Sequence, residues 1–140
     1  TKPSGELDMH LLLQRLCDDT RAVVHVHPTN IIAAMYAGLD LQKLASEFPE
    51  VSRYTQVGPS VPVLPVTSTE LANATYNAMK DPDSDKLIYD IVGQANHGVC
   101  AVAANPWDAF EHIERLEHIC QIALTSGKKS SGKSCNNLCW

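Results

Sequence analysis

The sequence predicts an α/β fold in which helices pack on a small sheet. Three short apolar runs suit strands, at residues 21–27, 86–92 and 99–103. The segments around them place apolar residues at the 3.6-residue spacing of amphipathic helices. A chain of 140 residues, 44% hydrophobic and 19% charged, suits one globular domain with a core of its own.

The first predicted helix runs from Glu6 to about Cys17, with Ser4 or Gly5 near its cap. Three leucines are expected to face the core: Leu7, Leu11 and Leu12. Glu6 has two interpretations, a carboxylate that caps the helix or a general base beside a metal ion. Ser4 and the amide of Gly5 precede the first turn, where N–H groups bind anions, and so form a candidate phosphate site.

A strand is predicted over residues 21–27. It ends at Pro28, because proline has no backbone N–H to donate to a neighbouring strand. Thr29 or Asn30 is then expected to cap a short helix that ends at Gly38.

The middle of the chain carries weaker signals. Residues 39–50 are ambiguous, with helical character at first and a break at Pro49. Residues 61–66 are apolar and extended, but two prolines without ladder donors predict an edge or irregular strand there. The capping box Thr67–Glu70 predicts a helix to about Lys80. Its inward positions are Leu71, Ala74, Ala78 and Met79.

Two strands and a long helix are predicted in the C-terminal part. The strands cover residues 86–92 and 99–103, with a turn between them. Asn105 caps the helix, Pro106 occupies its first position, and Gly127 ends it. Its apolar positions are Phe110, Ile113, Leu116, Cys120 and Leu124.

Residues 1–127 form the predicted domain, and the Ser/Lys-rich residues 128–140 are expected to form a flexible tail.

Composition and charge exclude several classes of partner. A net charge of −5 offers no basic face to nucleic acid, and no apolar run approaches the ~20 residues of a membrane span. Five irregularly spaced cysteines do not form a secreted disulfide framework, so a cytoplasmic location is expected.

The pair His25 and His27 is the strongest functional signal in the sequence. Side chains alternate along a strand, so both imidazoles point to one face, roughly 6–7 Å apart along it. They stand at the carboxyl end of the strand, where open sheets bind ligands. His97 is the third candidate, since it lies between two apolar strands and Gly98 allows a close approach of the backbone. Three imidazoles and an open position are the usual arrangement of catalytic zinc.

Four stretches of the sequence resemble the class II aldolase/adducin family, which includes the fuculose- and rhamnulose-1-phosphate aldolases. They are Pro3–Glu6 with His10, Ala22–Pro28, Asn96–Gly98 and the helix that begins at Trp107. The similarity runs from Pro3 to about Gly127. It implies a three-layer domain with a central, mainly antiparallel sheet flanked by helices. It also implies that the chain lacks the family's N-terminal segment, and is a fragment or depends on a partner for the missing strands.

The resemblance also implies a metal centre and a reaction. His25, His27 and His97 would hold one Zn²⁺, or another divalent metal, per subunit. Glu6 would ligate the resting metal and then move protons. The implied activity is that of a zinc-dependent lyase, which cleaves or forms a carbon–carbon bond in a ketose 1-phosphate through a metal-stabilised enediolate.

Three alternatives to the aldolase remain open. The 4-epimerases of the family tend to carry Asp at the position of Glu6, so the Glu favours an aldolase. A dehydratase of the methylthioribulose-1-phosphate type would keep the Glu. A non-catalytic, adducin-like scaffold is the third alternative, although such domains have generally lost the histidines that this chain retains.

The resemblance assigns further residues to substrate binding and assembly. Ser4 matches one of two hydroxyl residues that hold the substrate phosphate, and Gly5 replaces the second. Tyr54 stands where the fuculose enzyme has a tyrosine that reaches a neighbouring subunit's site. A homo-oligomer, a tetramer, is therefore implied.

Several other patterns do not predict function. Residues 127–134 match the letters of a P-loop, but a helix precedes them where the motif requires a strand. Cys135 and Cys139 have no second ligand pair nearby and are interpreted as tail thiols. His112 and His118 are expected at the surface, and His10 is expected to pack.

Overall fold

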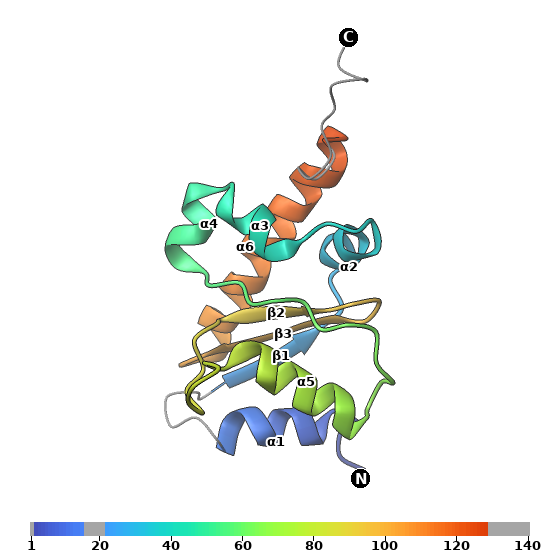
Figure 1. Ribbon diagram of the computed structural model, residues 1–140, viewed down its shortest axis with the longest axis vertical. Coiled ribbons are helices and arrows are strands. Elements are labelled where there is room, and N and C mark those ends of the chain that lie inside the picture. Colours follow the sequence, from blue (N-terminus) through green and yellow to red (C-terminus); the bar gives the residue numbers. More distant parts are fainter. Residues whose placement is uncertain (1, 16–21, 129–140) are drawn as a thin grey trace.

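A three-stranded antiparallel sheet forms the middle layer of the fold (Figure 1). The computed structural model describes residues 2–15 and 22–128. The sheet consists of β1 (Ala22–Val26), β2 (Ile91–Gln94) and β3 (Gly98–Ala103), in the spatial order β1-β3-β2. The predicted three-layer α/β class with an antiparallel sheet is confirmed.

Two helices cover one face of the sheet, α1 (Leu7–Arg15) and α5 (Thr69–Met79). Met9 and Leu13 of α1 are buried there, and the predicted inward residue Leu12 packs against them, whereas Leu7 is exposed, so the predicted inward face is only partly right. The contact with α5 selects the buried face, and the leucine spacing carries no information about that contact. The predicted end of this helix at Cys17 lies outside the described residues.

Four helices lie on the other side of the sheet: α2 (Thr29–Tyr36), α3 (Leu41–Ser46), α4 (Pro49–Tyr54) and α6 (Pro106–Ser126). Helices α2 and α6 contact the strands, and α3 and α4 pack against α6. Val24 and Val26 of β1 pack into the larger hydrophobic cluster on this side. The alternation of side chains therefore turns His25 to the opposite face, toward α1 and α5. Across the sheet His25 pairs with Cys100 of β3.

The long helix α6 begins and ends where the sequence predicts. Asn105 accepts a hydrogen bond from the N–H of Asp108 at 2.9 Å, Pro106 follows, and Gly127 adopts φ = 68°. Phe110, however, is 46% exposed, because Ala109 takes the inward position in that turn.

Helix α2 is capped from outside its own segment. Neither Thr29 nor Asn30 caps it, and the N-cap residue Pro28 makes no side-chain hydrogen bond. Instead, the carboxylate of Glu117 on α6 accepts from the backbone N–H groups of Asn30 and Ile31 at 3.0 and 2.9 Å. Neighbouring helices on one face of the sheet are thereby joined.

The ambiguous residues 39–50 contain the beginnings of two short helices. Asp40 caps α3 by accepting from the N–H of Lys43 at 3.1 Å. Pro49 begins α4 rather than ending a helix. Ser68, not Thr67, caps α5.

Two of the predicted strands differ from the observed ones. Strand β2 covers 91–94 instead of 86–92, and only Leu87 of the preceding segment forms a bridge, to Lys80. In 61–66 only Val61 pairs, through a single parallel bridge to Gln94. Within 2–15 and 22–128, no helix combines the length and apolar character that a membrane span requires. The predicted tail, apart from Lys128, lies outside the described residues.

Candidate metal centre

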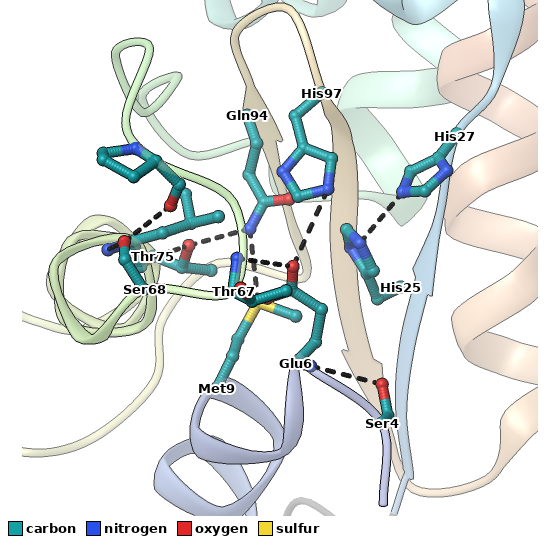
Figure 2. Close-up of polar contacts among 12 residues, drawn as sticks. Ser4, Glu6, Met9, His25, His27, Thr67, Ser68, Thr75, Gln94 and His97 are labelled. Carbon is teal, nitrogen blue, oxygen red and sulfur yellow. Dashed lines mark hydrogen bonds and ion pairs between the residues drawn. The ribbon is translucent and has the colours of Figure 1, made fainter.

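The three candidate histidines meet beside the β1–β3 pair (Figure 2). One ring nitrogen of each of His25, His27 and His97 lies within 4.8 Å of the other two. The Nε2 atoms of His25 and His27 are 3.1 Å apart, and the ring centroids are separated by 4.9 to 5.0 Å. Residues 70 positions apart in the chain thus form one cluster, as the sequence predicts.

A tight turn carries His97 to the strand-borne pair. Asn96 adopts φ = 57° between β2 and β3, and the N–H of His97 donates to the carbonyl oxygen of Gln94 at 3.0 Å. Asparagine tolerates this left-handed conformation better than most residues. Gly98 then pairs with Gln94 and begins β3 beside the end of β1.

The hydrogen bonding of His25 determines its tautomer. Its Nδ1 lies 2.9 Å from the carbonyl oxygen of Val99, which can only accept, so Nδ1 carries the hydrogen. The Nε2 atom of His25 is therefore unprotonated in the neutral ring and is directed at His27. An unprotonated ring nitrogen has a lone pair and can bind a metal ion.

Burial favours the neutral form of two rings of the cluster, those of His25 and His97. Desolvation is the largest effect that lowers the pKa of His25, and the nearby His97 adds to it. Desolvation also lowers the pKa of His97, against the opposing influence of Glu6. Neutral imidazoles are the form that binds metal, since a protonated ring has no lone pair to donate.

Glu6 lies directly beside the histidine cluster. Its Oε1 atom is 3.8 Å from Nε2 of His97 and accepts the backbone N–H of Thr67 at 3.2 Å. The side chain is only 12% exposed. Thr67 has φ = 58°, a strained conformation for a β-branched residue, and this conformation accompanies the donation of its N–H to the carboxylate.

Ser4 and Gly5 lie at the start of α1, next to Glu6. The Ser4 hydroxyl accepts the backbone N–H of Glu6 at 3.2 Å and is exposed. A Cβ atom at Gly5 would stand 2.6 Å from Cγ2 of Thr67, so no side chain fits at position 5 without a shift of that segment. The methyl group of Thr67 therefore occupies the space that a side chain at position 5 would need.

Tyr54 is not brought to the histidines of its own chain. It lies on α4, toward the end of the sheet opposite to α2 (Figure 1). Its ring is 51% exposed and contacts the guanidinium carbons of Arg53 and Arg115 at 5.3 and 5.4 Å from the ring centre.

Sequence reasoning missed a buried polar group behind His97. Gln94 is fully buried, and its Nε2 donates to Oγ1 of Thr75 at 2.9 Å and to Sδ of Met9 at 3.2 Å. A glutamine in an apolar strand, three residues before a candidate ligand, is the signal that could have identified it.

His112 was expected at the surface, and this prediction is wrong. Its Nδ1 lies 2.8 Å from Oγ1 of the buried Thr55, and its Nε2 is 3.8 Å from Asp90. Desolvation lowers the pKa of His112, and the nearby Asp90 opposes it. Its partners are the C-cap residue of α4 and a residue just before β2, which helical spacing alone could not reveal.

The donor set of the cluster suits a divalent transition metal. His25, His27 and His97 supply three imidazole nitrogens, and Glu6 supplies a carboxylate next to them. Three histidines with a further position for a carboxylate or substrate are the arrangement that zinc prefers in catalytic sites.

Comparisons with known proteins agree on one family. Residues 1–124 match the class II aldolase and adducin N-terminal domain. The 5-deoxy-D-ribulose 1-phosphate aldolase of Bacillus thuringiensis is 36% identical over 125 residues, which cover 86% of this chain and 52% of that protein. The rhamnulose-1-phosphate aldolase of Bacteroides thetaiotaomicron is 33% identical over 135 residues, 89% of this chain and 48% of that protein. The 3,4-dihydroxyphthalate decarboxylase of Rhodococcus jostii is 28% identical over 123 residues, with 85% and 47% covered.

A solved structure shows the same arrangement of elements. The sugar-phosphate aldolase from Thermotoga maritima superposes with a TM-score of 0.74 at 25% identity, covering 94% of this chain and 58% of that one. The chain spans about half the length of the curated relatives it matches. The match over residues 1–124 and the shared three-layer fold show that this chain belongs to the class II aldolase and adducin N-terminal domain family.

Proposed function

We propose that this chain carries the metal centre of a lyase that cleaves or forms a carbon–carbon bond in a ketose 1-phosphate. The observation that carries the proposal is the meeting of His25, His27 and His97 beside Glu6. Two of the relatives described above are aldolases of sugar 1-phosphates, which supports this substrate class.

His25, His27 and His97 would hold one Zn²⁺ per subunit. When bound, the metal supplies a Lewis acid that polarises the oxygen atoms next to the reacting bond. The protein's own contribution is to favour the neutral form of His25 and His97 by burial and to present the Nε2 atom of His25, which the hydrogen bond to Val99 leaves unprotonated.

Glu6 is assigned the proton transfer. Its carboxylate is largely shielded from water and is held at Oε1 by the N–H of Thr67. From this position Oε1 would exchange a proton with the substrate carbon next to the bond that breaks. Within residues 2–15 and 22–128, one hydrogen bond, from the N–H of Thr67, holds this carboxylate, so a shift toward or away from the histidines would break that one bond.

Ser4 and Tyr54 would complete the site. The Ser4 hydroxyl and the amide of Gly5, at the N-terminal end of α1, are positioned to bind a phosphate group, since the helix dipole favours an anion there. The exposed Tyr54, remote from the histidines of its own chain, is assigned to the site of a neighbouring subunit in a homotetramer.

A decarboxylase is the second candidate. Relatives of this chain include a 3,4-dihydroxyphthalate decarboxylase and a 3-oxo-tetronate 4-phosphate decarboxylase, whose names describe the loss of a carboxyl group. Decarboxylation also breaks a carbon–carbon bond next to a polarised oxygen, so the same metal centre and carboxylate would serve it.

Metal analysis and product analysis test the proposal together. We expect one zinc per purified chain, loss of zinc in His25→Ala and His97→Ala, and retention in His118→Ala, which removes an exposed histidine of α6. Incubation with a panel of ketose 1-phosphates should release an aldehyde. Release of CO₂ from oxo-acid phosphates would favour the decarboxylase, loss of water a dehydratase, and inversion without cleavage an epimerase. Wild-type chain without zinc would overturn the metal centre and favour the scaffold.

A further inference from the structure

Gln94 is a fully buried glutamine at the end of β2, beside the turn that carries His97. It pairs with Gly98 across the hairpin, and its backbone carbonyl accepts the N–H of His97. A glutamine side chain can form hydrogen bonds at both ends, and burying either end without a partner is costly. The groups around its side chain therefore show which hydrogen bonds the amide can form.

The orientation of the Gln94 amide follows from the chemistry of its partners. One end of the amide contacts Oγ1 of Thr75 at 2.9 Å and Sδ of Met9 at 3.2 Å. The single hydroxyl hydrogen of Thr75 is donated to the carbonyl oxygen of Leu71 at 2.7 Å, so its Oγ1 only accepts toward Gln94. A thioether sulfur also only accepts. The end that faces these two atoms must be the NH₂ group, and the other end is Oε1.

Two complementary atoms of the same hairpin, on residues three positions apart, remain without a hydrogen-bond partner. Among the residues that the structure describes, Oε1 of Gln94 and Nδ1 of His97 are the two buried side-chain atoms that lack a hydrogen-bond partner. One is an acceptor, and the other becomes a donor in one tautomer of the ring. Figure 2 shows Gln94 on the side of the His97 ring that faces away from His25 and His27.

The chemistry of a metal ligand decides which tautomer His97 needs. Its Nε2 is the nitrogen that faces Glu6, at 3.8 Å from Oε1. If Nε2 binds the metal, the ring hydrogen stands on Nδ1 and requires an acceptor in a buried place. Oε1 of Gln94 is the acceptor that the fold provides on that side.

We propose that Gln94 is a positioning residue for His97: its Oε1 accepts the Nδ1–H of His97 and so presents Nε2 to the metal. Thr75 and Met9 hold the amide in the required orientation. The inference rests on the proposed function, because it assigns a role toward the metal that His25, His27 and His97 would share. It gives Gln94, a residue of the otherwise apolar strand β2, a role in orienting a metal ligand.

Two substitutions of similar size separate positioning from packing. Gln94→Leu keeps an apolar side chain in the core but removes the acceptor. Gln94→Glu keeps an acceptor oxygen toward His97, while the Thr75 hydroxyl can turn to donate to the other oxygen. Val92→Ala is the control, since Val92 is a fully buried residue of the same strand, packs in the same hydrophobic cluster as Met9, and has no polar side-chain group to offer a histidine.

The zinc affinity of the full chain, measured by competition with a chromophoric chelator, is the first readout. We expect Gln94→Leu to bind zinc about 10–100-fold more weakly than wild type, the effect typical of removing a hydrogen-bond partner of a ligand. Gln94→Glu and Val92→Ala should bind zinc as tightly as wild type. A packing role predicts the opposite order, with Leu tolerated and the buried Glu harmful.

The second readout is the ¹H–¹⁵N NMR spectrum of the zinc-loaded chain. The Nδ1–H of His97 should exchange slowly with water in wild type and rapidly in Gln94→Leu. Wild-type zinc affinity and an unchanged Nδ1–H signal in Gln94→Leu would overturn the inference, and so would equal weakening by Leu and Glu. A wild-type chain that binds no zinc would overturn the proposed function itself, and is a distinct result.

A variant that fails to fold does not leave the inference untested. Thr75→Val removes the acceptor that orients the amide and leaves Gln94 in place. We expect it to weaken zinc binding in the same direction as Gln94→Leu. Unchanged zinc affinity in Thr75→Val would contradict the role assigned to the amide.

Discussion

Gly98 lies so close to His27 that a Cβ atom at position 98 would stand 2.7 Å from Cδ2 of the imidazole. The same Cβ would collide with the carbonyl oxygen of Val26, the last residue of β1. The absence of a side chain at position 98 thus allows the turn that carries His97 to approach the strand that carries His25 and His27. A glycine is required here by contact, not by its φ angle.

We expect Gly98→Ala to lose zinc and to unfold more easily. Overpacking of this kind costs about 1–3 kcal/mol, and here it would displace a candidate ligand. Gly127→Ala is the matched control: position 127 has open space but φ = 68°, so alanine is strained there by about 1–2 kcal/mol. Urea unfolding should show similar losses in both variants, and metal analysis should show lost zinc in Gly98→Ala alone. Stoichiometric zinc in Gly98→Ala would contradict this account of the site.

Glu6→Gln should retain zinc and lose turnover. The amide has nearly the same shape and still offers an oxygen to the N–H of Thr67, but it cannot take up a proton. Removal of a general base typically lowers the rate about 10²–10⁴-fold. Asp8→Asn makes the same change of charge at an exposed position in the first turn of α1 and should leave both zinc and rate unchanged. Undiminished turnover in Glu6→Gln would exclude this residue as the base.

The metal-free protein should become less stable as the pH falls. Burial lowers the pKa of His25, His97 and His112 from the ordinary value of 6.5. Below pH 6.5 the unfolded chain therefore binds protons on these rings before the folded chain does, and protons favour unfolding. The free energy of unfolding should be highest above pH 6.5 and should fall as the pH drops through the lowered pKa values of the folded rings.

Urea titrations between pH 8 and pH 5 would measure this dependence. The double substitution His25→Gln with His97→Gln should make it shallower, because two of the three shifted groups are gone. Stability that stays constant or rises on acidification from pH 8 would show that burial does not control these rings. Zinc-loaded protein should show a steeper loss, since protons and metal compete for the same nitrogens.

Sequence patterns that act within one helical turn or one strand predicted the matching parts of the structure correctly. The boundaries of α6 follow from Asn105, Pro106 and Gly127, whose effects act within one turn of the helix. His25 and His27 point to the same face because side chains alternate along any β-strand. The third ligand candidate, His97, was found by chemistry and resemblance, and the turn at Asn96 then explains how it reaches the pair.

Features that depend on contacts between residues far apart in the chain could not be predicted from the sequence. The buried face of α1 is selected by α5, and the cap of α2 comes from Glu117, 87 residues after Asn30. The shift of β2 to 91–94 reflects its pairing with β3, which a single apolar run does not encode. The orientation of Gln94 depends on Thr75 and Met9 from two helices, and no pattern within β2 predicts it.

Glu117→Ala should destabilise the protein and loosen the segment that carries His27. The carboxylate accepts the N–H groups of Asn30 and Ile31 and the side-chain amide of Asn30 at 2.8 to 3.0 Å, so its removal leaves helix N–H groups unpaired at a half-buried position. The expected loss is about 1–3 kcal/mol in the free energy of unfolding. Since α2 begins two residues after His27, zinc affinity should also weaken, although Glu117 does not touch the metal site. Glu114→Ala, an exposed glutamate of the same helix, is the control and should change neither quantity. Equal stability of the Glu117→Ala and Glu114→Ala proteins would show that the carboxylate is not the cap of α2, and weakened stability with unaltered zinc affinity would show that α2 does not position His27.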